Sequence, residues 1–554
     1  MIARLTRALG ALRGKTINWR LRPQLSLETV LLATSLFFAL ACNASFWRSA
    51  YHWSSGGVGF VLCLLVLLVS VHAWVLGLLV WRWNAKPLLG ALLLVAALAG
   101  HYMGRYQVYI DAAMLRNVLH TDLRESRELV TPALVWAVLA IAVVPCLALW
   151  RIRLRSPSLG RTLLVRVGFL AAVTLSGLGA ALLSFQDLSA LMRNHREIRY
   201  LATPINLLAA ARSNLKAALS VPRGPKQPLE NDAKATPRAP GARPRLLVIV
   251  LGEAARAQNW GLNGYRRQTT PTLAQVQGLV NFRDMHSCGT STDVSVPCLF
   301  SPLGRHDYDE GKIRSRQSLL HVLEHAGIAT LWRDNQSGCK GVCDGLATER
   351  LHDAAVPGLC SEARCLDEVL LQGLAAQARS QPGDRVVVLH QLGNHGPSYF
   401  ERYPAPFRRF APACEDPDLG RCSRQQIVNA YDNALLYTDH FLGRTIEALR
   451  AMDDYDTAMI YVSDHGESLG EKGLYLHGVP YAIAPREQTA IPMVMWFSTA
   501  FLHGRGLTLP CLQRRANHRT DHDHLFSSVL GLMQVRTRVY DAARDLFANC
   551  GRRG

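Results

Sequence analysis

The stretch at residues 287–300, S-C-G-T-S-T-D-V-S-V-P-C-L-F, has the residue types that a nucleophile and its support need. Its hydroxyl residues are Thr290, Ser291, Thr292 and Ser295, and Cys288 and Cys298 bracket them. A disulfide between the two cysteines would fix the direction of one hydroxyl, which matters because a misplacement of about 1 Å can cost ~100-fold in rate. A threonine hydroxyl must be activated by a base or a metal. The stretch is either a catalytic centre or a cross-linked surface turn, depending on what other segments bring to it.

Short β-like runs alternate with helical patterns after residue 245, which predicts an α/β/α sandwich around a largely parallel sheet. The predicted strands are 246–251, 280–283, 329–333, 386–390, 458–462 and 493–496, and the predicted helices are 318–325, 425–450 and 524–532. In such sheets a ligand binds beyond the carboxyl ends of the strands. The residues that follow each strand are therefore the candidates for a site.

Carboxylates, imidazoles and one lysine follow these predicted strands. They are Glu253, Lys340, His395, Asp464 and His465, and His477 follows a Gly-punctuated loop after the last of these. Each residue alone would more often be a cap or a satisfied polar group, but their occurrence together at one sheet edge favours a functional site.

The set suggests zinc bound through oxygen and nitrogen ligands. Glu253, Asp464 and His465 would leave a fourth position that Thr292 could fill. Coordination would lower the pKa of its hydroxyl, as zinc lowers that of bound water to about 7. A phosphate is the natural electrophile, because its oxygens need cations, and the remaining lysine and histidines would supply charge or hold a second metal.

Five apolar segments before residue 190 predict five membrane-spanning helices. They cover residues 27–47, 58–81, 87–103, 132–150 and 162–185. Lys and Arg are concentrated in the first 24 residues and in the loops at 82–86 and 151–161, so the N-terminus is expected in the cytoplasm. An odd number of spans then places everything after residue 186 outside.

Ten of the 13 cysteines lie after residue 287. Their close pairs are 288/298, 339/343, 360/365 and 414/422, with Cys511 and Cys550 left over. Paired spacing in polar sequence indicates disulfides in an oxidising compartment, which agrees with the predicted orientation. Zinc binding is the competing interpretation for Cys339 and Cys343, and sequence does not fix whether Cys511 pairs with Cys550.

The predicted domains are a transmembrane part at 1–186, amphipathic helices and a Pro-rich linker at 187–245, and a catalytic domain at 246–554. The net charge of +19 is expected to serve contact with an anionic membrane, because no nucleic-acid-binding signature accompanies it. The polar run 517–524 is metal-like, but its position before an apolar helix favours a capping cluster. We expect a monomer.

Five long motifs resemble the membrane phosphoethanolamine transferases that modify lipid A. They are G-E-A-A-R (252–256), C-G-T-S-T-D-V-S-V-P-C-L-F-S (288–301), W-R-D-N-Q-S-G-C-K-G-V-C (332–343), L-H-Q-L-G-N-H-G-P (389–397) and Y-V-S-D-H-G-E-S-L-G-E-K-G-L-Y-L-H-G (461–478). That family includes the mobile colistin-resistance enzymes and belongs to the alkaline phosphatase/sulfatase superfamily. The resemblance implies an enzyme of the Gram-negative inner membrane with its catalytic domain in the periplasm.

The resemblance also implies roles for single residues. Thr292 would be the nucleophile, with Glu253, Asp464 and His465 as zinc ligands. The residues near a second metal or the substrate would be His395, His477 and Lys340, and the disulfides would be Cys288–Cys298, Cys360–Cys365, Cys414–Cys422 and, as in some members only, Cys339–Cys343. A weaker match at 114–125 implies that Asn117, Thr121 and Glu125 approach the ethanolamine head group.

Two residues depart from the family pattern. Ala254 stands where a small hydroxyl residue is usual, and Asp293 where a neutral residue is commoner. Neither departure removes a ligand. Asp293 is expected to cap the helix that begins there and to shift metal affinity or nucleophile basicity slightly.

The predicted reaction is a two-step transfer. Thr292 attacks phosphatidylethanolamine, diacylglycerol leaves, and a lipid A phosphate attacks the resulting intermediate, which would weaken binding of cationic peptides such as polymyxin. The alternatives are an enzyme acting on lipopolysaccharide core sugars, a glycerol phosphate transferase, a hydrolase such as a phosphatase or sulfatase, and a non-catalytic membrane sensor of the same fold. The sensor would be expected to have lost a residue of the site, and none is lost.

Overall fold

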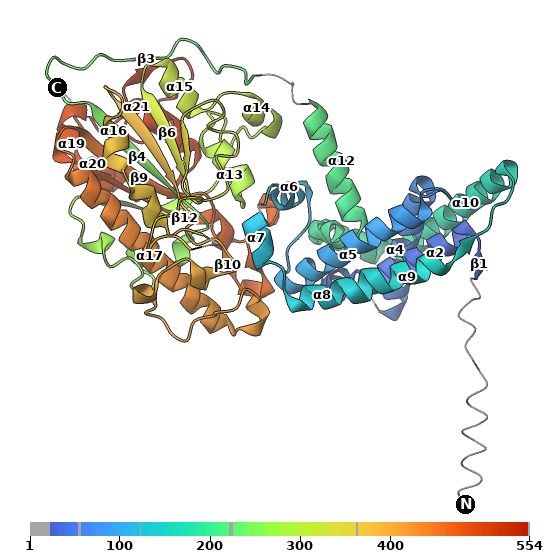
Figure 1. Cartoon of the computed structure of the whole chain (residues 1–554). Helices are drawn as coiled ribbons and strands as arrows, with labels where there is room; N and C mark the ends of the chain where they lie inside the picture. The colour runs from blue at the N-terminus through green and yellow to red at the C-terminus, as the bar shows by residue number, and fades with distance from the viewer. Residues whose placement is uncertain (1–22, 54–56, 122, 221–224, 362–363, 552–554) are drawn as a thin grey trace, which may run out of the picture. The chain divides into compact units, whose positions relative to one another are not determined.

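A computed structural model describes residues 23–53, 57–121, 123–220, 225–361 and 364–551, which form two compact units (Figure 1). The first unit comprises Met1–His101 and Pro132–Asn206, and the second comprises Tyr102–Thr131 and Leu207–Gly554. Residues 102–131 therefore group with the C-terminal unit, although the sequence placed them in the transmembrane domain. The basic residues of the first 22 positions, on which the predicted orientation partly depends, lie outside the described residues.

Four described helices are long and apolar enough to cross a membrane. They are α4 (Val58–Leu79), α5 (Ala85–Tyr106), the continuous stretch Pro132–Arg151 and α10 (Leu159–Leu183). The first predicted span is instead a bent pair, α2 (Leu27–Ala41) and α3 (Ala44–Trp53), whose axes differ by 60°. The predicted five spans are thus four, or five if the bent pair counts as one.

Two local features explain the irregular spans. At the bend in the first pair, the side-chain amide of the buried Asn43 donates to the carbonyl oxygens of Phe38 (2.8 Å) and Thr203 (2.7 Å). Asn43 is therefore held at the point where the two helices meet. The stretch Pro132–Arg151 consists of α8 (Pro132–Val138), a π-helical turn at Leu139–Val143 and α9 (Val144–Arg151). Pro145 lacks the N–H of a regular helix, which accounts for the widened turn before it.

The second unit is built on an eight-stranded sheet with the order β13-β5-β12-β9-β4-β8-β6-β7. The strands are β4 (Arg245–Gly252), β5 (Val280–His286), β6 (Ala329–Asp334), β7 (Thr348–Arg350), β8 (Arg385–His390), β9 (Asp456–Ser463), β12 (Ala490–Phe497) and β13 (Thr520–Asp521). Only β12 runs antiparallel to its neighbours, so the predicted largely parallel sheet is confirmed.

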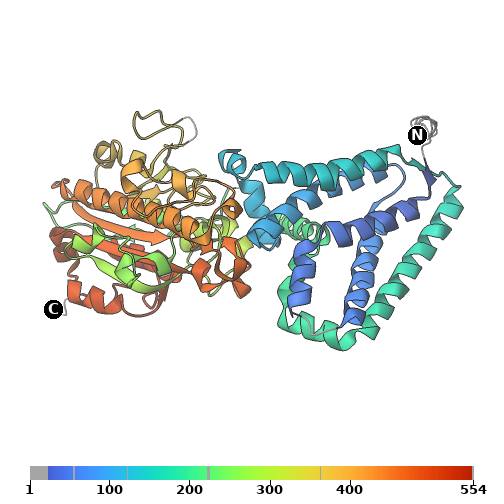
Figure 2. The same ribbon diagram turned by 90° about the horizontal axis from the view of Figure 1, so that it is seen from below.

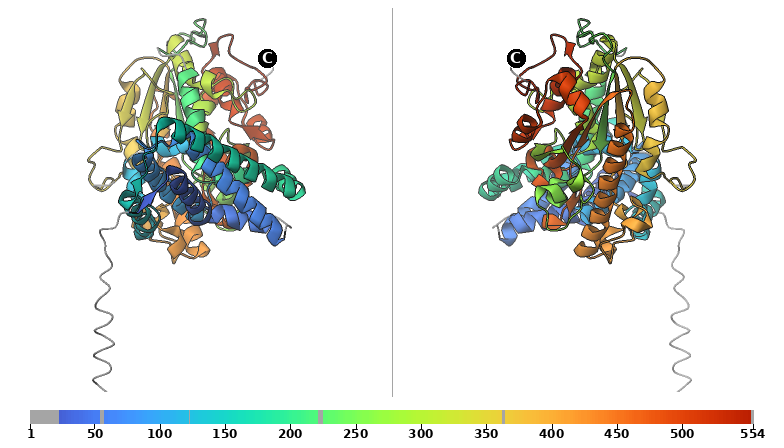
Figure 3. Two further views of the ribbon diagram at one scale, coloured as in Figure 1. Left: turned by 90° about the vertical axis from the view of Figure 1, so that its right-hand side faces the viewer. Right: turned by 90° about the vertical axis from the view of Figure 1, so that its left-hand side faces the viewer.

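Helices lie on both sides of this sheet (Figure 3). Alternate residues of β4 and β9 enter a core shared with α15 (Leu319–His325) and α21 (Asp523–Leu532). The long helix α17 (Arg424–Arg450) runs along the sheet and contacts β9 (Figure 2). All six predicted strands and all three predicted helices of this region are therefore present.

The strand directions bring the loops of the site to one edge. β4, β8 and β9 are mutually parallel, and β5 runs in the same direction because the antiparallel β12 separates it from β9. The carboxyl end of β5 leads into helix α13 (Thr292–Leu299). The stretch 287–300 therefore reaches the same edge as the residues that follow β4 and β9.

The region predicted as amphipathic helices and a Pro-rich linker, residues 187–245, contains helices and a short strand. Helices α11 (Phe185–Asn194) and α12 (Ile205–Ser220) occupy the region predicted to be amphipathic. Within the Pro-rich segment, β3 (Lys234–Ala235) pairs with β14 (Val535–Arg536). Part of the predicted linker thus belongs to the C-terminal unit.

Candidate active site

Thr292, Glu253 and His465 meet at the carboxyl edge of the sheet. Thr292 Oγ1 lies 3.1 Å from Glu253 Oε2 and 3.4 Å from His465 Nε2, and His465 Nε2 lies 3.2 Å from Glu253 Oε1. All three side chains are buried. Glu253 directly follows β4 and His465 lies two residues beyond β9, so the parallel pairing of these strands places both groups beside the hydroxyl.

Thr292 begins helix α13, and its loop is held from two directions. Cys288 and Cys298 form a disulfide and are both fully buried. The backbone N–H of Cys288 donates to His522 Nδ1 (3.1 Å), and His522 Nε2 lies 3.0 Å from the carbonyl oxygen of Ser463. The imidazole thus connects the loop before Thr292 to the end of β9.

Asp464 completes a set of three potential metal ligands with Glu253 and His465. Its Oδ1 accepts from the backbone N–H groups of Ala254 (3.1 Å) and His465 (2.7 Å). Its Oδ2 is buried and has no hydrogen-bond partner among the described residues, although His465 Nε2 lies 3.4 Å away. A buried, unpartnered carboxylate oxygen beside a second carboxylate and an imidazole fits a divalent zinc ion.

The pKa values of these three groups show strong mutual interaction. Burial and the charge of Glu253 raise the pKa of Asp464 to about 7. Burial alone would lower the pKa of His465, but Asp464 and Glu253 raise it to about 10. Burial would raise the pKa of Glu253, but the hydrogen bond and charge of His465 bring it below its usual value. A bound cation would compensate the negative charge of the two carboxylates that surround this imidazole.

His395 and His477 lie beside this centre. The ring centroid of His477 is 4.3 Å from that of His465 and 5.6 Å from that of His395. His477 Nδ1 lies 2.8 Å from Glu467 Oε2, and the hydroxyl of Tyr399 donates to Glu467 Oε1 at 2.6 Å. Glu467 can join His465 and His477 as a second group of ligand atoms.

Lys340 and the predicted head-group residues lie on other elements. The Lys340 ammonium donates to the Ser337 carbonyl oxygen (3.2 Å) and lines a cavity. Asn117 lies on α6 (Ala112–His120), which contacts α13, and Thr121 Oγ1 donates to the Asn117 carbonyl oxygen. Glu125 belongs to α7 (Leu123–Glu128), but its side chain lies outside the described residues. The substrate roles of these residues remain predictions.

Asp293 does not cap helix α13, so that prediction was wrong. It is the second residue of the helix, and Ser291 occupies the N-cap position without a side-chain hydrogen bond. The Asp293 carboxylate is buried and instead lies 2.6 Å from Arg314 Nη2 and 2.8 Å from His120 Nδ1. Partners outside the helix, Arg314 and His120, therefore hold the carboxylate away from a capping position.

Several residues that support the site were missed in the sequence. Gln336 Nε2 donates to Glu253 Oε2 at 3.3 Å, and the hydroxyl of Tyr431 donates to the Ala254 carbonyl oxygen at 2.7 Å. Ala254 itself has φ 54°, which places a non-glycine residue in the left-handed region. Gln336 and Glu467 lie inside the quoted motifs, but only the fold shows what they contact.

Five disulfides are present in the described chain. They join Cys288–Cys298, Cys339–Cys343, Cys360–Cys365, Cys414–Cys422 and Cys511–Cys550. The last pair is the one that spacing left open. Of the three free cysteines, Cys63 and Cys146 lie in α4 and α9, and Cys42 directly follows α2.

Comparison with known proteins gives two family matches. The sulfatase family matches residues 245–535, and the family described as phosphoethanolamine transferase EptA/EptB matches residues 67–219. The chain is 36% identical to phosphoethanolamine transferase EptA of Escherichia coli K12 over 96% of this chain and 98% of the relative. It is 35% identical to phosphatidylethanolamine transferase Mcr-1 of Escherichia coli over 86% of this chain and 90% of the relative.

A solved structure gives the same result. The integral membrane lipooligosaccharide phosphoethanolamine transferase A of Neisseria meningitidis superposes with a TM-score of 0.92 at 37% identity. The superposition covers 96% of this chain and 100% of the solved one. The match therefore includes the apolar helices as well as the sheet and the residues at its edge.

Proposed function

The chain belongs to the phosphoethanolamine transferase family, and we propose that it transfers phosphoethanolamine from phosphatidylethanolamine to a phosphate of lipid A through a covalent intermediate on Thr292. The observation that carries this proposal is the placement of Thr292 Oγ1 within 3.1–3.4 Å of Glu253 and His465. Membrane helices suit this role, because both substrates are lipids and tethering raises their effective concentration.

The proposed metal is zinc, held by Glu253, Asp464 and His465 with Thr292 at the fourth position. When bound, zinc supplies a positive charge that lowers the pKa of the Thr292 hydroxyl and stabilises charge developing on the phosphate. Disulfide Cys288–Cys298 and the His522 bridge hold the Thr292 loop in place during the reaction. His395 and His477 lie on the side of the site where a phosphate or a second metal would be bound.

The first step forms a bond between Thr292 Oγ1 and the phosphorus of the donor and breaks the bond from phosphorus to diacylglycerol. The proton of the Thr292 hydroxyl is transferred to the diacylglycerol oxygen that leaves. In the second step a hydroxyl oxygen of the acceptor phosphate attacks the same phosphorus and the bond from phosphorus to Thr292 Oγ1 breaks. The proton of the acceptor hydroxyl passes to Thr292 Oγ1, which restores the threonine. The product carries phosphoethanolamine through a phosphate–phosphate bond, which masks one anionic group of lipid A. The same product implies reduced binding of cationic peptides such as polymyxin.

The proposed location is the inner membrane of a Gram-negative bacterium, with the C-terminal unit in the periplasm. Disulfides in the described C-terminal unit support an oxidising compartment, and the apolar helices support membrane insertion.

Mass spectrometry of the intact protein tests the covalent step. After incubation with phosphatidylethanolamine, the wild-type protein should carry one phosphoethanolamine on Thr292, and Thr292→Ala should carry none. An adduct on a different residue would refute the assignment of Thr292. Lipid A extracted from expressing cells tests the acceptor: addition to a phosphate supports the proposal, and addition to a core sugar contradicts it.

A further inference from the structure

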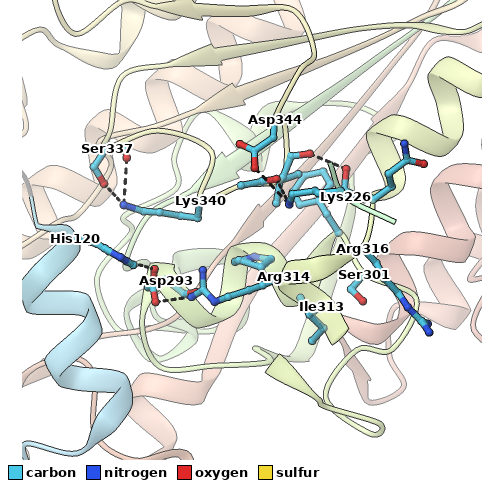
Figure 4. Close-up of a pocket in the computed structure, with 16 residues that line it drawn as sticks. His120, Lys226, Asp293, Ser301, Ile313, Arg314, Arg316, Ser337, Lys340 and Asp344 are labelled. Atoms are coloured by element: carbon cyan, nitrogen blue, oxygen red, sulfur yellow. Dashed lines mark hydrogen bonds and ion pairs between the residues drawn. The ribbon is translucent and has the colours of Figure 1, made fainter. Parts of the chain in front are cut away.

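A cavity of about 450 Å³ adjoins the site on the side of helix α13. Its walls come from His120 of α6, from α13 and the two residues after it, from the segment 313–318, from the loop 337–344 and from residue 226 of the Pro-rich segment. Figure 4 shows Lys226, Arg314 and Lys340 around the same space. The cavity is therefore built from five stretches of the C-terminal unit that are separate in the sequence.

The cavity walls carry more positive than negative charge. The lining includes four cations, Lys226, Arg314, Arg316 and Lys340, and two carboxylates, Asp293 and Asp344. The Asp293 carboxylate is already engaged by Arg314 and His120. Arg316 has no carboxylate within ion-pair distance among the described residues, which leaves its guanidinium available for an anion.

Backbone pairing places Lys226 in the wall. Gln227 N donates to the Ser315 carbonyl oxygen at 2.9 Å, and Gln317 N donates to the Gln227 carbonyl oxygen at 2.8 Å. The pairing holds Lys226 against the opposite loop, where its ammonium donates to the Gly341 carbonyl oxygen and lies 3.6 Å from Asp344. Burial lowers the pKa of Lys226, so an anion in the cavity would favour its charged form.

Two walls of the cavity continue directly from the site. Asp293 follows Thr292, and Ser337 follows Gln336, whose amide is 3.3 Å from Glu253. Disulfide Cys339–Cys343 spans the loop that carries Lys340. A ligand in the cavity would thus lie next to the group being transferred.

We propose that this cavity binds a phosphate of the acceptor other than the phosphate that is modified, with Arg316 and Lys226 as its main contacts. The inference rests on the proposed function and names the chemistry of its acceptor, a sugar bearing more than one phosphate. The donor head group fits less well, because its ammonium would face an excess of cations. Guanidinium and ammonium groups bind phosphate through charge-assisted hydrogen bonds.

Separate measurement of the two half-reactions tests the proposal. The full-length protein in detergent is assayed for diacylglycerol release without acceptor and for transfer to lipid A with two phosphates or with one. Arg316→Ala and Lys226→Ala should each raise the KM for the bisphosphorylated acceptor by about 10-fold, the loss expected for one charge-assisted hydrogen bond. The KM for the monophosphorylated acceptor should not change, because the bound phosphate is missing.

Two controls separate charge from folding. Lys312 is an exposed cation of α14 (Glu310–Ser315) that is not among the residues lining the cavity, so Lys312→Ala should leave the acceptor KM as in the wild type. Arg316→Lys keeps the charge and should recover part of the affinity. Unfolding temperatures of all variants identify any that fail to fold.

The alternative outcomes are distinct. An unchanged acceptor KM in both alanine variants would overturn the proposal, as would an equal loss with both acceptors. Slower diacylglycerol release without acceptor would assign the cavity to the donor instead. A wild-type protein that forms no adduct would refute the proposed function itself.

Titration of glucosamine 1-phosphate into Thr292→Ala, with and without Arg316→Ala, then tests binding to the cavity without turnover. Equal affinities of the two proteins for glucosamine 1-phosphate would overturn the proposal that the cavity binds phosphate.

Discussion

Asp293 Oδ2 lies 2.6 Å from Arg314 Nη2, and Asp293 is the residue directly after Thr292. The carboxylate is almost fully buried, and His120 on α6 lies 2.8 Å from its other oxygen. Arg116, also on α6, lies 3.5 Å away and pairs with Glu310. Asp293 therefore ties the beginning of α13 to two elements that are distant in the sequence, α6 and α14.

We expect Asp293→Ala to lower both stability and turnover. Loss of the carboxylate would remove the acceptor of His120 and one of the acceptors of Arg314, which keeps Glu310 and the Asp293 carbonyl oxygen. We expect a cost of roughly 1–3 kcal/mol, below the roughly 3–5 kcal/mol of a fully buried pair, because Arg314 is 24% exposed and keeps these partners. A double-mutant cycle with Arg314→Ala measures the coupling. Asp309→Ala, at an exposed helix cap, is the control. Unchanged zinc content and turnover in Asp293→Ala would contradict a positioning role.

The sheet and the candidate ligands could be predicted because their signals are local. β4, β8 and β9 are continuous apolar runs, and Glu253, Asp464 and His465 stand immediately after them. In a parallel sheet, adjacency to a strand end in sequence becomes proximity in space. Gln336 and Glu467 also follow β6 and β9, but their contacts with Glu253 and His477 could not be predicted, because an amide or a carboxylate in a loop shows no partner until the loop is folded.

Other features leave no periodic pattern in the sequence. The bend at Asn43 interrupts an apolar segment by one polar residue, too little to separate one span from two helices. β13 has two residues, so His522 after it was interpreted as part of a capping cluster. Lys226 lies in a Pro-rich segment whose docking depends on backbone pairing at Gln227. Composition describes these segments correctly but does not show what they contact.

The Cys288–Cys298 disulfide gives a second prediction. It closes a loop of sequence separation 10 around Thr292, and removing such a cross-link costs about 2–3 kcal/mol in chain-entropy terms. We expect Cys288→Ser/Cys298→Ser to lower the unfolding temperature. Turnover should fall by more than the loss of folded protein explains, because the loop positions Thr292, the proposed nucleophile. The Cys414→Ser/Cys422→Ser variant is the matched control. Equal losses of turnover in both double variants would show a purely structural role.

Metal binding should become stronger as pH rises. Asp464 and Glu253 overcome the effect of burial and raise the pKa of His465 to about 10, so the metal-free protein keeps this imidazole protonated at neutral pH. Zinc must displace that proton, which predicts an increase in affinity of about tenfold per pH unit for each proton released. Calorimetry in two buffers of different ionisation enthalpy counts the protons. Release of no proton would contradict the assignment of His465 as a ligand.

Removal of one carboxylate tests the same ligand set. Asp464→Asn keeps the shape of the side chain but removes the negative charge of the carboxylate, whose Oδ2 is buried and has no hydrogen-bond partner among the described residues. The zinc content should therefore fall and turnover should be lost. A chelator should lower the unfolding temperature of the wild type more than that of the variant, because only the wild type has bound metal to lose. Equal zinc content in the two proteins would exclude Asp464 from the site.

His522 should make the protein sensitive to acid. Burial lowers its pKa to about 4 from an ordinary value of 6.5, so the folded protein holds the neutral imidazole that accepts from the Cys288 N–H. Because the folded pKa is depressed, this contribution to stability is present above pH 6.5 and is lost as pH falls toward 4. His522→Gln should therefore unfold at a lower temperature than the wild type at pH 8, and the difference should shrink by pH 4.5. His306→Gln, at a side chain that is 79% exposed, should follow the wild-type curve. The unfolding temperatures of these proteins, measured from pH 8 to pH 4.5, test this prediction. If the unfolding temperatures of His522→Gln and the wild type differ by the same amount at every pH, the neutral imidazole has no part in the acid response.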